Sequence, residues 1–486
     1  MTQLPGLVLA LGLGGALVAG ISMTGRGRPE VAGRGGVRGP RGARWARRRD
    51  LRPLRVAPES PPPGRLLLGV LPGVARVTGL AAEAAQSLVV IGPTQSGKTT
   101  SLAVPAILGW PGPVVAASVK SDLLRHTLMA RSRLGQVWCI DPTRSTGIRP
   151  STWSPLTGCG QWREACRAAA DLCEAAKGEG TTADGDFWYA TAGKLLAPLF
   201  VAAALDHRTM ADVVRWVDTQ EMGEVASILE RAAAPEVLHA AESTWSRDDR
   251  TRSSVYTTAE TVLAPFAHES PGLATSGAFE PGHLLDGAHT LYLCAPAHDQ
   301  RRLRGYFTAL TQAVLAHAFT CATKSGEPLD PPLLVVLDEA AHIAPLPELD
   351  GLAATCASHG IQIVTIWQDL AQVRGRYGAR APTVLNNHRA KLFLPGIADP
   401  DTLDYASRLI GDEEASIPSV TRDPTGRRST TSSTTPRRLL SPEALRCLQR
   451  GRAVLVYGSL PPVRLQLRPW WTQGRRPLQG GPAPTA

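Results

Sequence analysis

The sequence has few cysteines and lacks any arrangement of them that would hold a metal ion. Eight cysteines occur in 486 residues, but none form a C-x-x-C pair or lie near histidine at zinc-finger spacing. A structural zinc site is therefore not expected. Most of these cysteines lie in apolar stretches, as free buried thiols do, so a reducing, cytoplasmic location is the simpler interpretation for the main body.

Most of the chain also has little net charge. The formal net charge is +10, but residues 24–56 hold eleven arginines and no lysine against two acidic residues, which gives +9. The rest is close to neutral (+10 minus +9), since residues 1–23 carry no ionisable side chain. The basic balance is therefore poor evidence of nucleic-acid binding, because a DNA-binding surface would have to concentrate its basic residues locally.

The N-terminus carries an apolar run without any charged residue, from Leu4 to Met23. Twenty such residues are long enough to cross a membrane once as a helix. The arginine-rich segment that follows places everything from about Thr24 onward in the cytoplasm by the positive-inside rule. A cleaved signal peptide is the alternative, but the positively charged start that it usually has is absent.

A glycine-rich loop follows a predicted buried strand at residues 87–91. Residues 92–99, Gly-Pro-Thr-Gln-Ser-Gly-Lys-Thr, match G-x-x-x-x-G-K-[ST] at every fixed position. Backbone N–H groups of such a loop point at a phosphate chain, while Lys98 reaches the β- and γ-phosphates and Thr99 ligates Mg²⁺. The pattern predicts a site for ATP and Mg²⁺. The residues expected to bind the nucleotide are Gly92, Pro93, Thr94, Gln95, Ser96, Gly97, Lys98, Thr99 and Thr100.

A second apolar run, residues 333–338, ends in two acidic residues. Asp338 is expected to hold Mg²⁺ together with the loop threonine, and Glu339 to polarise the attacking water. The strand predicted at residues 361–368 ends in Gln368, which can sense the γ-phosphate; a plain polar residue at a strand end is the alternative. The catalytic residues expected from these motifs are Lys98, Glu339 and Gln368.

Further apolar runs predict the fold class. Additional strands are expected at residues 112–118, 136–140, 290–295, 391–395 and 453–457. Because these runs are apolar throughout and alternate with amphipathic helical stretches, they predict an α/β fold with a doubly wound, mainly parallel sheet. Between residues 161 and 266 only helical periodicity is found, which predicts an inserted all-α domain.

These signals divide the chain into six parts, which its length and globular composition allow. The predicted parts are a transmembrane anchor (1–23), an Arg/Pro/Gly-rich cytoplasmic linker (24–64), a nucleotide-binding domain in two segments (65–160 and 271–474), the all-α insertion (161–270) and a disordered tail (475–486). Within the second segment, residues 418–438 are nearly free of apolar side chains and predict an exposed loop or hairpin.

The motifs resemble those of the type IV coupling proteins of the TraG/TraD class, over about residues 60–470. The resemblance is carried by the glycine-rich loop, Ser118-Val-Lys-Ser-Asp-Leu, Phe187-Trp, Val335-Val-Leu-Asp-Glu, Gly360-Ile-Gln-Ile-Val-Thr-Ile-Trp-Gln-Asp and Asn386-Asn-His-Arg-Ala-Lys-Leu-Phe-Leu-Pro-Gly. It implies a membrane-anchored, RecA-like P-loop ATPase that forms a homo-hexamer. It further implies transport of single-stranded DNA, or DNA bound to a relaxase, into a conjugative type IV secretion channel. Relatives usually have two membrane helices, and here one is predicted, so either a span was lost or the start codon is misplaced.

Other functions remain open on the motifs alone. An FtsK-like or HerA-like chromosome pump would use the same engine, but the long helical insertion between the two motifs favours the coupling class. A receptor that recruits substrates without hydrolysis would not need the paired carboxylates. An ATPase of an ABC transporter is not favoured, because no LSGGQ-type signature occurs.

Ring ATPases often complete the site with an arginine from the neighbouring subunit. Arg389 is the candidate, because it lies just ahead of the predicted strand at residues 391–395 within a segment that resembles the family. An ion pair inside its own subunit is the alternative role for this side chain. Arg374, Arg376 and Arg380 are rival candidates from the segment after Gln368.

Overall fold

The structure is a computed structural model, and it describes residues 42–73, 77–178, 183–267, 279–422, 426 and 428–472. The predicted anchor, the first part of the predicted linker and the predicted tail lie outside these residues.

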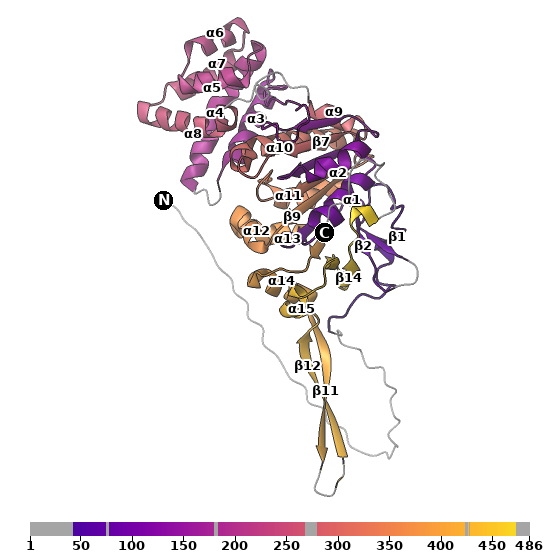
Figure 1. Ribbon diagram of the computed structural model, residues 1–486. Helices are drawn as coiled ribbons and strands as arrows, with labels where there is room; N and C mark the ends of the chain where they lie inside the picture. Colours follow the sequence, from indigo (N-terminus) through magenta and orange to yellow (C-terminus); the bar gives the residue numbers. More distant parts are fainter. Residues whose placement is uncertain are drawn as a thin grey trace, which may run out of the picture. The chain divides into compact units, whose positions relative to one another are not determined.

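A single large sheet organises the described part of the chain (Figure 1). It contains twelve strands of the described residues in the order β1-β3-β2-β14-β13-β10-β4-β9-β8-β5-β7-β6. In this spatial order, the strands from β10 to β6 pair parallel with their neighbours. The strands from β1 to β13 pair antiparallel and form one side of the sheet, and β13 joins it to β10 by a further antiparallel pairing. The strands are β1 (Arg55–Val56), β2 (Leu67–Val70), β3 (Gly79–Ala81), β4 (Leu88–Ile91), β5 (Val114–Ser118), β6 (Val137–Ile140), β7 (Thr290–Cys294), β8 (Leu333–Asp338), β9 (Ile361–Trp367), β10 (Ala390–Phe393), β13 (Arg452–Tyr457) and β14 (Val463–Gln466).

The mainly parallel α/β class expected from the apolar runs is confirmed. In β4 the alternate residues enter two separate cores, Val89 and Ile91 on one face and Leu88 and Val90 on the other. Because both faces of these strands are buried, their residues are apolar at every position and do not alternate with polar ones.

The helices around the sheet are η2 (Thr99–Ala103), α1 (Val104–Gly109), α2 (Asp122–Arg131), α9 (Pro281–Leu285), α10 (Gln300–Ser325), α11 (Leu349–Thr355), η3 (Cys356–His359), α12 (Leu370–Tyr377), η4 (Gly378–Arg380), α13 (Ala381–Asn387) and α14 (Pro400–Ile410).

The antiparallel side of the sheet departs from the sequence analysis. Residues 42–64 were expected to belong to a poorly ordered linker, but they contain the helix η1 (Arg52–Leu54) and the strand β1. Leu51 and Leu54 are fully buried, and the Ala46 N–H donates to the Pro462 carbonyl at 2.8 Å. The described part of the arginine-rich segment therefore belongs to the folded body, because Leu51 and Leu54 share a core cluster with Leu465 of β14.

Six helices lie among the described residues from Trp162 to Ala267, between β6 and β7. They are α3 (Trp162–Ala176), α4 (Ala183–Leu205), α5 (Met210–Asp218), α6 (Gly223–Arg231), α7 (Pro235–Trp245) and α8 (Asp249–Ala267). Of these, α6 and α7 were not predicted individually. α3 packs against α4 and α10, and α4 also packs against α7 and α8 (magenta in Figure 1). By length and composition, α4 is the described helix that could cross a membrane, but 61% of its apolar stretch is buried inside the protein, as in a core helix.

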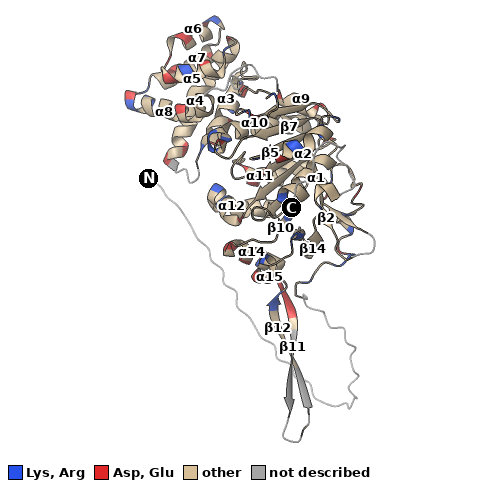
Figure 2. Ribbon diagram, viewed as in Figure 1, with Lys and Arg blue, Asp and Glu red and all other residues tan. Residues whose placement is uncertain are grey.

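Residues 418–438 form most of a β-hairpin, one of the two outcomes expected for them. The strands β11 (Asp412–Arg422) and β12 (Arg428–Arg438) pair with each other as a separate two-stranded sheet. At its base, acidic residues of β11 face basic residues of β12 (Figure 2), and Glu413 and Asp412 pair with Arg437 and Arg438 at 2.6 and 3.0 Å. The helix α15 (Pro442–Arg446) follows, and η5 (Trp470–Thr472) ends the described chain.

Candidate functional site

The glycine-rich loop joins β4 to η2 at the carboxyl edge of the parallel strands. Its entry is anchored to β9, because the Gly92 N–H donates to the Trp367 carbonyl at 3.1 Å. A Cβ atom at position 92 would lie 2.7 Å from the Cβ atom of Leu394, so only glycine fits there. The loop turns through positive φ angles at Gln95 (61°) and Gly97 (89°), and left-handed residues of this kind are typical of turns whose successive N–H groups bind anions.

Lys98 is buried, with 7% of its surface exposed, and its ammonium group lies inside the loop. It donates to the carbonyls of Gly92 and Pro93, the latter at 2.8 Å. Burial lowers the pKa of Lys98, and the nearby carboxylates of Asp338 and Glu339 oppose that shift. Its ammonium is thus held beside the two acidic residues that the sequence analysis placed in the same site.

Asp338 at the end of β8 is in contact with Thr99 at the start of η2. The Thr99 hydroxyl donates to a carboxylate oxygen of Asp338 at 2.8 Å, although 239 positions separate them in the chain. Asp338 ends β8 beside Ser118 of β5, and only 6% of its surface is exposed. Burial raises the pKa of Asp338 to about 6, and the Thr99 hydrogen bond opposes the rise. These two side chains supply hard oxygen donors of the kind that hold Mg²⁺ together with substrate phosphates, so they fit that ion.

Glu339 and Gln368 complete the cluster. Glu339 directly follows β8 and has a φ angle of 68°, a left-handed backbone conformation that is unusual for a residue with a side chain. The Gln368 amide lies 3.4 Å from a Glu339 carboxylate oxygen. The structure therefore brings Lys98, Thr99, Asp338, Glu339 and Gln368 to one edge of the sheet.

Other loop residues have mixed roles. The Ser96 hydroxyl donates to the Pro93 carbonyl at 2.7 Å, and the Thr100 hydroxyl contacts the Gly97 carbonyl at 3.5 Å. Thr94 and Gln95 are exposed at the tip.

Sequence reasoning missed two residues that hold Gln368 in place. Gln372 accepts a hydrogen bond from the Gln368 N–H at 2.9 Å, and its own N–H donates to Asp369 at 2.9 Å. Asp369 is the N-cap of α12. The signal was present in the sequence, since Asp-Leu-Ala-Gln before an apolar helix is a capping-box pattern.

Arg389 does not lie near this cluster within its own chain. It precedes β10, which runs parallel to β4, so it lies at the opposite edge of the sheet from the loop. Its guanidinium pairs with Glu83 at 3.1 Å and lies over the Tyr457 ring at 5.4 Å. Among its rivals, Arg374 pairs with Asp401.

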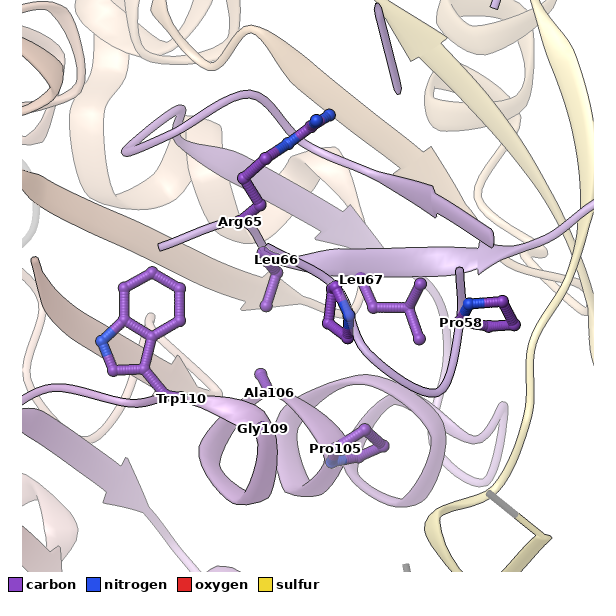
Figure 3. Close-up of a pocket in the computed structure, with 9 residues that line it drawn as sticks. Pro58, Arg65, Leu66, Leu67, Pro105, Ala106, Gly109 and Trp110 are labelled. Carbon is purple, nitrogen blue, oxygen red and sulfur yellow. The ribbon is translucent and has the colours of Figure 1, made fainter. Parts of the chain in front are cut away.

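A pocket between β2 and α1 is separate from the loop (Figure 3). Pro58, Leu67, Pro105 and Trp110 form much of its apolar lining, and Arg65 lies at one side. None of its lining residues belongs to the glycine-rich loop or the acidic pair. This pocket therefore offers no chemistry to the candidate site.

The parallel sheet, the glycine-rich loop after β4 and the Asp-Glu pair after β8 define a RecA-like P-loop α/β protein. Within that class, the chain belongs to the family described as "Type IV secretory system Conjugative DNA transfer", whose profile matches residues 70–478. The resemblance noted from the motifs is thereby confirmed.

Individual relatives are identical to the chain at about a quarter of the aligned positions. "Conjugal transfer protein TraG" of Rhizobium radiobacter is 25% identical over 398 residues, which cover 77% of this chain and 60% of the relative. "Protein VirD4" of Agrobacterium fabrum is 25% identical, covering 78% of this chain and 57% of the relative. The chain thus spans somewhat under two thirds of the length of these relatives.

Solved structures share the fold. The plasmid coupling protein TrwB in complex with the ATP analogue ADPNP has a TM-score of 0.64 at 19% identity, covering 90% of this chain and 96% of that one. TrwB in complex with ADP and Mg²⁺ has a TM-score of 0.58 at 18% identity, covering 86% and 97%. At such identities the likeness concerns the fold alone.

Proposed function

We propose that this protein is an ATP-driven DNA translocase that acts as the coupling protein of a conjugative type IV secretion system. The observation that carries the proposal is the convergence of Lys98, Thr99, Asp338, Glu339 and Gln368 at the carboxyl edge of one parallel sheet. Membership of the conjugative DNA-transfer family supports the substrate and the pathway. A chromosomal DNA pump would use the same kind of ATPase domain, but no observation on this chain favours that function.

The side chains of the cluster have complementary roles in ATP hydrolysis. Lys98 and the N–H groups of the loop balance the charge of the β- and γ-phosphates. Thr99 and Asp338 would hold Mg²⁺, which when bound would supply positive charge against the phosphates. Glu339 orients the attacking water and accepts its proton. Gln368 contacts the γ-phosphate, so the position of the segment that follows β9 depends on whether that phosphate is present. The solved complexes of TrwB, which has this fold, with ADP and Mg²⁺ and with an ATP analogue support the binding of nucleotide and Mg²⁺.

The other parts of the proposal concern assembly and location. Residues 4–23 anchor the chain in the cytoplasmic membrane with the motor in the cytoplasm, and α3 to α8 form the all-α domain inserted into it. Six copies form a ring, with Arg389 as the candidate that completes the site of a neighbour. The partners are single-stranded DNA, the relaxase bound to it and the proteins of the secretion channel.

The proposal is tested with detergent-solubilised full-length protein and variants of the two motifs. We expect Mg²⁺-dependent ATP hydrolysis that DNA stimulates. Lys98→Ala should abolish nucleotide binding or turnover, while Glu339→Gln should keep ATP bound but lower turnover by about a hundredfold or more, since the base is lost. The measurements are ATP turnover and the retention of labelled nucleotide.

Exposed residues of the same types provide matched controls. Lys324→Ala and Glu327→Gln change exposed side chains at and just beyond the end of α10 and should behave as the wild type. Wild-type turnover in both motif variants would contradict the assignment of the site.

A further inference from the structure

The segment that follows Glu339 is irregular but buried. Ile343, Ala344 and Leu346 have no exposed surface, and the chain then enters α11 at Leu349. Residues 345–347 read Pro-Leu-Pro, so two of the three lack an N–H group and their carbonyls have no regular ladder to join. Buried carbonyls of this kind need side-chain donors.

Three side chains from the end of α12 and η4 supply those donors. The Tyr377 hydroxyl donates to the Leu346 carbonyl at 2.9 Å, and Arg380 donates to the Pro347 carbonyl at 2.9 Å. Arg376 reaches the Pro345 carbonyl at 3.5 Å, the longest of the three contacts. Successive carbonyls of the segment after Glu339 are therefore held by Arg376, Tyr377 and Arg380, which we call the carbonyl clamp.

The same helix is fixed at its other end to Gln368. As described above, Gln372 and Asp369 join the first turn of α12 to the backbone of Gln368, whose side chain contacts Glu339. α12 is eight residues long, from Leu370 to Tyr377. The short helix α12 thus connects Gln368, which is expected to sense the γ-phosphate, to the segment that follows Glu339, which is expected to polarise the water.

Arg376 also contacts the helical region. Its guanidinium donates to the carbonyl of Lys177, the C-cap of α3, at 3.2 Å. Lys177 in turn pairs with Glu174 of α3 and with Asp186 of α4, the latter at 2.8 Å. One side chain of the clamp therefore joins the segment after Glu339 to the junction of α3 and α4.

We propose that the carbonyl clamp positions Glu339 for hydrolysis and that Arg376 couples this position to the helices α3 and α4. The inference rests on the proposed ATPase function and assigns positioning roles to two of the arginines that sequence analysis had considered as fingers. When α12 shifts with Gln368, the clamp moves residues 345–347, and a displacement near 1 Å at the catalytic carboxylate is enough to change the rate strongly. The helices sense that shift through the Lys177 carbonyl.

The first test removes a single hydroxyl. Tyr377→Phe keeps the buried ring but leaves the Leu346 carbonyl without its donor, and kcat should fall about five- to tenfold with KM for ATP unchanged. Turnover is expressed per nucleotide-binding site, counted by titration with a fluorescent ATP analogue, so that a misfolded fraction does not mimic the effect. Tyr405→Phe is the matched control, because it removes the hydroxyl of a half-buried tyrosine on α14, outside the clamp.

The second test separates positioning from coupling by the ratio of DNA-stimulated to basal turnover. Arg380→Gln, which loses the Pro347 contact, should lower both rates equally and keep the ratio. Arg376→Gln should lower the basal rate and also bring the ratio close to one, because it loses the Lys177 contact as well. Neither ratio depends on the fraction of folded protein. Arg376→Lys, which keeps a donor, should recover part of the stimulation.

Each outcome decides the inference. Unchanged kcat per site in Tyr377→Phe, or equal stimulation ratios in Arg376→Gln and Arg380→Gln, would overturn it while the wild type remains active. An inactive wild type, indistinguishable from Lys98→Ala, would overturn the proposed function and this inference with it.

Discussion

At the scale of single residues, His388 links α13 to β9 just before β10 begins, toward the sheet edge opposite the glycine-rich loop. Its ring is fully buried, Nδ1–H donates to the Val384 carbonyl at 2.7 Å, and Nε2 accepts from the Thr365 hydroxyl at 3.2 Å. Both bonds suit the neutral ring. Burial lowers the pKa of His388 to about 4, and the charge of Lys391 lowers it further.

This histidine predicts a specific pH dependence of stability. The unfolded chain binds a proton near pH 6.5 and the folded chain near pH 4, so its contribution to stability is present above pH 6.5 and is lost as the pH falls toward 4. The loss between pH 7 and pH 5 should be about 2 kcal/mol. Lys391, whose pKa burial lowers to about 8, acts in a separate window between about pH 8 and its unfolded value of 10.5.

The measurement is the difference in thermal midpoint between pH 7 and pH 5. His388→Gln should show a smaller difference than the wild type, because the glutamine does not titrate. His239→Gln, at an exposed position on α7, should match the wild type. Equal pH dependence of wild type and His388→Gln would contradict the argument.

At the scale of elements, one buried arginine joins α2 to the start of the parallel strands. Arg131 is fully buried at the end of α2, and burial lowers its pKa to about 10. Its guanidinium donates to the Thr290 hydroxyl and to the carbonyls of Trp110, Gly112, Ala288 and His289, at 2.6 to 3.3 Å. Thr290 begins β7, and the carbonyls belong to the segments that precede β5 and β7, so one side chain donates to both segments.

Replacing this arginine should destabilise the protein strongly. Arg131→Met leaves several buried carbonyls without donors, and we expect a loss of more than about 3 kcal/mol, with a smaller loss for Arg131→Lys. The measurement is the thermal midpoint of the full-length protein. Arg133→Met, two positions away and exposed, is the control. A midpoint within the error of the control would show that the carbonyls find other partners.

At the scale of the whole molecule, the proposal that Arg389 completes the site of a second copy of the chain depends on how easily Arg389 leaves its own partners. Arg389 lies at the sheet edge opposite the glycine-rich loop, and its pair with Glu83 is about half exposed. Ion pairs of that kind contribute little, about 0–1 kcal/mol, so releasing Arg389 to a neighbour's γ-phosphate costs little.

A mixing experiment tests that role in trans. Arg389→Ala alone should lower turnover by about a thousandfold, as loss of an arginine finger does. Rings that mix Arg389→Ala with Lys98→Ala subunits contain some interfaces with both groups intact, so part of the activity should return. Arg408→Ala, an exposed arginine of α14, serves as the control. Full activity of Arg389→Ala alone, or no recovery in verified mixed hexamers, rules the role out.

The sequence by itself determined the local patterns of this protein. The glycine-rich loop and the acidic pair are contiguous motifs, and the parallel strands are apolar throughout because both of their faces are buried. The strand β8 was expected at residues 333–338 and is found there. These features depend on a few neighbouring residues, so their signal is complete within a short window.

Only the tertiary structure decided the order of the strands, the antiparallel side of the sheet and the carbonyl clamp. β1 and β3 are two and three residues long, too short for a periodic signal, and they are strands because neighbours pair with them. Tyr377 reaches a carbonyl 31 positions away, and Thr99 reaches Asp338 across 239 positions. Such contacts depend on how distant segments pack, because no short stretch of sequence contains both partners.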